Sequence, residues 1–148
     1  MGNAARNTRP RRVLMATPLL GSLALASQPL PSGLYEITVE TNMPHLEENL
    51  RYATTHETRC LRGQDLTTAF PVLQHASLQD CRLEPEQRAD GEAFYRLVCA
   101  GGHGTTGNAV WTFDAHRIIG TLHVKLGGKN MTFSQRWTAI PMGQCEVR

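Results

Sequence analysis

Cysteine is the residue type in this chain that most directly implies chemistry. The four cysteines contain no Cys-x-x-Cys pair, which excludes a zinc ribbon or a thioredoxin-type motif. An even number of cysteines in an exported chain is typical of disulfides. Three pairings are compatible with the sequence, and each bridge would add about 2–4 kcal/mol to stability. We favour Cys81–Cys99, which flank an expected hairpin, and Cys60–Cys145, which would tie an early strand to the C-terminus.

Histidine and methionine are the candidate metal ligands. Met43 with His45, and His123 with Met131 across an expected hairpin, are the pairs that favour copper. Neither pair is a complete ligand set, so we assign no metal ligand and no cofactor. Scattered surface histidines are the simpler interpretation, and a copper or zinc protein remains the alternative function. The other histidines are His56, His75, His103 and His116.

No group of residues predicts catalysis. Ser134, His123 and Asp114 fall in one expected meander, but no nucleophile elbow surrounds the serine, and we interpret the grouping as coincidence. The glycine-rich run 101–107 lacks the lysine of a phosphate loop and predicts a bend between strands. Paired cysteines are not nucleophiles. We therefore expect no catalytic residue, and an enzyme of unknown type is the third hypothesis.

The aromatic residues allow two interpretations. They form the core of the domain, or they line a pocket for an apolar guest in a half-open β cup. The core interpretation is the simpler one, and the two overlap because a cup needs a core as well. The candidate ligand-binding residues are Tyr35, Trp111, Phe113, Phe133 and Trp137.

The elements that must position these residues are mostly strands. Period-two alternation of apolar and polar residues, interrupted by Asp-Gly and Gly-Gly turns, predicts a single antiparallel β-meander domain. The sheet is expected to form a curved sheet, a half-barrel or a small barrel, with one short helix over 63–70 and two disulfides. The stretch 72–79 fits a helical turn or a loop. The expected strands are 34–41, 51–60, 81–83, 94–99, 110–113, 118–126 and 131–138.

The N-terminus predicts export. Residues 1–12 hold four arginines and no acid, an apolar run follows from Val13, and small residues end it at Ala24-Leu25-Ala26. These are the three parts of a secretory signal peptide, and the run is too short to favour a membrane anchor. Residues 1–26 are therefore expected to be a signal peptide, 27–32 a linker and 33–148 the β domain.

The signal also changes the charge argument. The whole chain has a formal charge of +2, but the signal carries four of its 15 basic residues and none of its 13 acidic ones. The domain that remains is formally acidic, so we expect no nucleic-acid partner.

The domain resembles a known family. The opening Gly33-Leu34-Tyr35-Glu36, then Arg59-Cys60-Leu61, then Val98-Cys99 before a glycine-rich stretch, and a terminal Gly143-Gln144-Cys145 are similar to the exported bacterial family called domain of unknown function three-six-one-seven. The family usually has tryptophan where Tyr35 stands. The residues that usually follow its Cys-Leu also differ from those that follow Cys60-Leu61 in this chain. The resemblance implies a bacterial, mostly periplasmic protein and assigns no catalytic residue.

Together these patterns predict a small binding or accessory protein in the periplasm or secreted from a bacterium. It would hold a small apolar ligand or dock onto an envelope protein. We expect no membrane span once the signal is removed.

Overall fold

The structure is a computed structural model that describes residues 30–146 except 48–50, 65, 102–103 and 129–130. Residues 1–26, expected to be a signal peptide, lie outside the described residues, as does linker segment 27–29. In the part of the chain that is described, no helix is long and apolar enough to cross a membrane.

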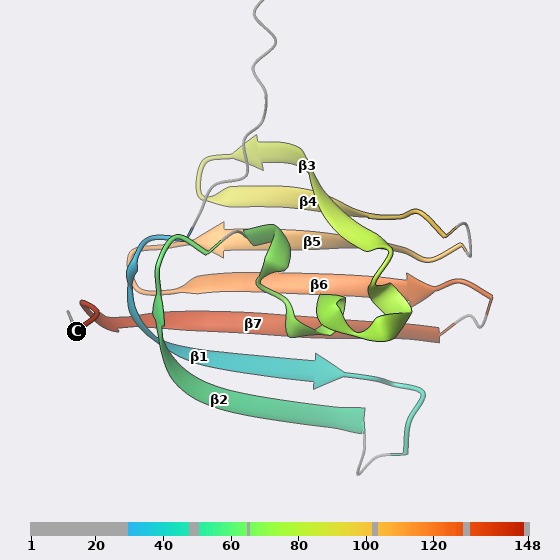
Figure 1. Ribbon diagram of the computed structural model, residues 1–148, viewed down its shortest axis with the longest axis horizontal. Coiled ribbons are helices and arrows are strands. Elements are labelled where there is room, and N and C mark those ends of the chain that lie inside the picture. Colours follow the sequence, from blue (N-terminus) through green and yellow to red (C-terminus); the bar gives the residue numbers. More distant parts are fainter. Residues whose placement is uncertain (1–29, 48–50, 65, 102–103, 129–130, 147–148) are drawn as a thin grey trace, which may run out of the picture.

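The domain is one open, seven-stranded antiparallel sheet in the order β2-β1-β7-β6-β5-β4-β3 (Figure 1). Every neighbouring pair is antiparallel. The predicted β-meander is confirmed, as an open sheet and not as a closed barrel. The strands are β1 (Gly33–Asn42), β2 (Tyr52–Leu61), β3 (Cys81–Ala89), β4 (Glu92–Cys99), β5 (Thr106–Phe113), β6 (Ile118–Leu126) and β7 (Met131–Gly143).

The expected helix is replaced by three short 3-10 turns: η1 (Leu66–Thr68), η2 (Pro71–Gln74) and η3 (Ala76–Leu78). Pro71 does not follow the helix that the sequence predicts over 63–70. It stands at the start of η2, where the missing proline N–H leaves no hydrogen bond unmade. The segment is too short, and too irregular in its apolar spacing, to favour an α-helix over tight turns.

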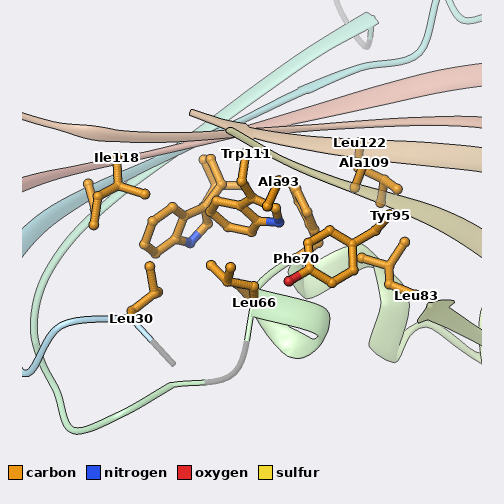
Figure 2. Packing of buried hydrophobic residues seen from close by; sticks show 14 of the residues in the cluster. Leu30, Leu66, Phe70, Leu83, Ala93, Tyr95, Ala109, Trp111, Ile118 and Leu122 are labelled. Atoms are coloured by element: carbon orange, nitrogen blue, oxygen red, sulfur yellow. The ribbon is translucent and has the colours of Figure 1, made fainter. Parts of the chain in front are cut away.

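These turns cover one face of the sheet (Figure 1). Phe70, Leu66 and Leu78 are each almost completely buried against the strands, as is Leu30, which precedes β1. Figure 2 shows Leu66 and Phe70 facing Trp111 on the sheet. The alternating strands place apolar side chains on this covered face. The segment from η1 to η3, which we call the lid, packs against them and forms the second layer of the core. The opposite, open face bears mostly polar side chains.

The two tryptophans meet in the middle of the core. The register aligns Trp137 of β7 with Gly120 of β6, and Gly120 with Trp111 of β5. The missing side chain at Gly120 lets the rings approach edge to face, with centroids 5.4 Å apart, and Phe70 packs on Trp111 at 5.0 Å.

The two edges of the sheet differ. On β3 the pairing is interrupted between Pro85 and Gln87, and proline and charged residues protect this edge from pairing with another chain. On β2 all ten residues pair with β1 without a shift, and every side chain from Tyr52 to Arg59 is exposed. Figure 1 shows the 3-10 turns over the other strands of the sheet, away from this one.

Both predicted disulfides are present. Cys60–Cys145 links the end of β2 to the segment after β7, and Cys81–Cys99 joins β3 to β4 as a directly paired position. No cysteine is free. Two disulfides indicate that the folded protein belongs to an oxidising environment.

Candidate functional site

A small pocket opens at one end of the covered face, where η2 and η3 meet β7. We call it the end pocket. It has a volume of about 160 Å³. Its lining is Met43, His45, Leu46, Val72, His75, Ser77, Leu78, Leu126, Met131, Thr132 and Phe133.

The inner lining is apolar. Leu78 and Phe133 are buried, and Val72 and Leu126 are half-buried and pack against the core. Four segments supply these side chains: η2, η3, the end of β6 and the start of β7. Almost no polar atom lines this part of the pocket, so it favours an apolar occupant over water.

The outer lining holds different chemistry. His45, Leu46 and His75 are exposed and therefore belong to the mouth of the pocket, whereas Met43 and Met131 are half-buried and Met43 also packs against the core. Two imidazoles and two thioethers therefore line one pocket.

The loop after β1 is fixed in place by hydrogen bonds. The backbone N–H of Met43 donates to the carbonyl of Arg51 at 2.8 Å, and that of Leu46 donates to the carbonyl of Met43 at 3.1 Å. The backbone N–H of Thr132 donates to Nε2 of His45 at 2.8 Å. His45 therefore ties this loop to the start of β7, and its Nε2 carries no proton in this arrangement.

His75 is held from the opposite side of the mouth. It is the N-cap of η3, where its Nδ1 accepts from the backbone N–H of Ser77 at 3.2 Å and lies 2.7 Å from the hydroxyl of Ser77. Its Nε2 is not used by these contacts. Its carbonyl accepts from the backbone N–H of Leu78 at 2.9 Å.

Gln135 attaches η2 to the sheet beside the pocket. It is the one buried polar side chain in the described core, and its amide bridges two elements. Its Nε2 donates to Oγ1 of Thr41 at 2.9 Å, and its Oε1 accepts from the backbone N–H of Val72 at 3.3 Å. These bonds fix the height of Val72 above the sheet.

The five aromatic candidates divide into two groups. Tyr35, Trp111 and Trp137 are buried in the core, and Phe113 packs against its edge. Burial raises the pKa of the Tyr35 hydroxyl above its usual value, and that hydroxyl donates to the carbonyl of Pro31 at 3.0 Å. Phe133 is the one candidate of the five that lines the end pocket.

The two candidate copper pairs are rearranged. Met43 and His45 line the pocket together, and Met131 joins them. His123 does not, because its position in β6 directs it to the open face, while Met131 belongs to the covered side. His75, which belonged to neither pair, replaces it. His103 lies outside the described residues.

Ser134 and His123 do not form a triad with Asp114. They lie opposite each other on β7 and β6, but Asp114 is in the turn at the other end of β6. There Asp114 accepts backbone hydrogen bonds from His116 and Arg117, which, with the Arg117 charge, hold its pKa below the usual value.

A second, polar depression lies on the open face at the same end of the sheet. Its volume is about 470 Å³. Asn108, His123, Ser134 and Asn42 follow one another across β5, β6, β7 and β1 in register. Thr132 and Phe133 line this depression as well as the end pocket, so the start of β7 separates the two.

Sequence reasoning missed His75, Leu46, Val72 and Leu78. They lie in loops and 3-10 turns, where no periodic pattern indicates which side chains face the sheet. The available signal was Pro71, which opens η2.

Comparison with protein-family models, with curated proteins and with solved structures found no match. The resemblance to the exported bacterial family stays a prediction, and the function rests on the pocket itself.

Proposed function

We propose that this chain is an exported bacterial binding protein, periplasmic or secreted, that holds a small apolar guest in the end pocket. The observation that carries the proposal is the apolar interior of that pocket, which opens beside exposed Leu46 while the rest of the core is filled by aromatic and aliphatic side chains. Export is supported by the N-terminal sequence pattern and by the two disulfides.

The size of the pocket limits the guest. A dry apolar cavity of about 150 Å³ accommodates a molecule the size of benzene. The end pocket, at about 160 Å³, therefore fits a single ring or a short alkyl chain. A larger ligand would leave its remaining atoms outside, against Leu46 and the two histidines at the mouth.

The role we propose is non-catalytic. The described residues place no nucleophile, base and orienting group together, and Ser134 faces the side opposite the end pocket. An apolar pocket bordered by a few polar groups fits binding and release of a guest.

The test is a calorimetric titration of the folded, oxidised protein with benzene and indole. Val72→Phe fills the pocket from η2, and we expect it to abolish binding of both probes. Val110→Phe makes the same change on the open face, where Val110 is also half-buried, and should bind like the wild type. Equal binding by the two variants, or no binding by the wild type, would refute the proposal.

A further inference from the structure

The lining of the end pocket also contains side chains that can bind a metal ion, which an apolar guest does not need. Two thioethers and two imidazoles border a volume of about 160 Å³, and they come from three separate parts of the chain. The loop after β1 supplies Met43 and His45, the junction of η2 and η3 supplies His75, and the first residue of β7 is Met131. We propose that these four side chains form a Cu(I) site at the mouth of the pocket.

The donor set selects the metal. Thioether sulfur is a soft ligand that suits Cu(I), and imidazole nitrogen completes such a site. Zn(II) would need additional thiolate, imidazole or carboxylate ligands. The part of the chain that the structure describes contains no cluster of three or more histidine, cysteine or acidic side chains suited to a metal, and both disulfides remove the thiolates. The methionines are therefore what makes a site here.

The surroundings favour the reduced ion. Among the described residues no carboxylate lines the pocket, so no negatively charged oxygen ligand is there to stabilise a divalent cation. The apolar side chains behind the methionines exclude water from one side of the ion. Leu78 and Phe133, both buried, provide that side.

The two histidines differ in how readily they can bind. Nε2 of His75 makes none of the hydrogen bonds that fix the ring, because its Nδ1 contacts Ser77. A proton moved from Nε2 to Nδ1 would displace the Ser77 backbone N–H but could donate to the Ser77 hydroxyl, so one contact between the ring and Ser77 remains when Nε2 binds copper. Nε2 of His45 instead accepts the backbone N–H of Thr132, a bond that copper binding at His45 must break. The amide signal of Thr132 should therefore change when copper binds at this site.

This inference rests on the proposed function only in requiring an accessible end pocket. Binding of a ring compound to the interior and binding of Cu(I) at the mouth use different atoms. Leucine replaces methionine with little change in volume and removes the sulfur. The double variant M43L/M131L therefore separates the two: it should still bind benzene and should bind copper more weakly.

The experiment is an anaerobic titration of the oxidised protein with Cu(I) against a chromogenic Cu(I) chelator, with Ag(I) as a redox-inert probe in native mass spectrometry. The wild type should bind one ion per chain. M43L/M131L should weaken the affinity by about 100-fold, and His75→Asn, which retains an N-cap acceptor, by about 10-fold. M142L and H123N remove the same atoms from exposed positions outside the pocket and should bind as the wild type does.

A nuclear magnetic resonance spectrum of the Ag(I) complex supplies the second readout. The amide resonance of Thr132 should shift strongly, since its hydrogen-bond acceptor is lost. Binding weaker than micromolar in the wild type, or equal affinity in M43L/M131L and M142L, would overturn the Cu(I) site. If benzene still binds in that case, the proposed function stands without the Cu(I) site. Copper binding without benzene binding would refute only the proposal of an apolar guest.

Discussion

Gly120 determines how the central tryptophans pack. A Cβ built at this position would lie 2.6 Å from the ring of Trp111, closer than any real contact. The period-two pattern puts Gly120 on the same face of β6 as Ile118 and Leu122 but contains no reason for a glycine there. The reason is a cross-strand neighbour, which a single strand pattern does not reveal.

We predict that Gly120→Ala lowers the free energy of unfolding by about 1–3 kcal/mol, because overpacking forces Trp111 from its position. Chemical denaturation measures the change. In a Trp111→Leu background the same substitution should cost much less, since the clashing ring is gone. Additive costs of the two substitutions would show that the ring and the glycine do not interact.

Asp114 stabilises the turn between β5 and β6 in its ionised form. Backbone hydrogen bonds from His116 and Arg117 lower its pKa in the folded state. The stabilisation is therefore fully present above the unfolded pKa of about 3.9 and disappears as pH falls through the lower folded-state value. Asp114→Ala should have a slightly lower melting temperature than wild type at pH 7. The difference in melting temperature between the variant and the wild type should disappear in strong acid. A difference that does not depend on pH would contradict this account.

At the scale of elements, the strands were predictable and the lid was not. Most strands alternate apolar and polar residues, although β2 is polar and exposed along most of its length. The Asp-Gly and Gly-Gly turns indicate where the chain reverses. All seven expected strands exist, although β3 extends beyond Leu83 through Pro85, which an edge strand tolerates. The 3-10 turns lack periodicity, so neither their form nor the pocket beneath them followed from the sequence.

Phe70 is the largest fully buried side chain of the lid. This ring is fully buried and contacts Trp111, whereas Leu73 in the same segment is half-buried. Phe70→Ala should cost about 3–5 kcal/mol, and Leu73→Ala about 1 kcal/mol. Similar costs for the two, measured by denaturant unfolding, would mean that the lid does not pack as described.

At the scale of the whole molecule, the two disulfides constrain different amounts of chain. Cys60–Cys145 spans 85 residues and Cys81–Cys99 spans 18. Loop-closure entropy predicts a loss of about 4–5 kcal/mol in C60S/C145S and about 3 kcal/mol in C81S/C99S. Equilibrium unfolding of the two double variants tests the order. The opposite order would show that local strain or residual structure outweighs chain entropy here.

Both pairings were the favoured sequence prediction, because one flanks an expected hairpin and the other ties the end of an early strand to the C-terminus. The end pocket could not be predicted in the same way. Its lining comes from the loop after β1, from η2 and η3, and from the ends of β6 and β7. Only the three-dimensional arrangement places Met43 and Met131, far apart in sequence, around one opening.

The most direct measurement is a crystal structure of the oxidised protein under xenon pressure. Xenon occupies dry apolar cavities of this size. The account predicts one strong xenon peak in the end pocket, among Val72, Leu78 and Phe133, and its loss in Val72→Phe. A pocket that stays empty, or xenon bound only inside the Trp111 core, would contradict the claim that this protein holds a guest at the end of its covered face.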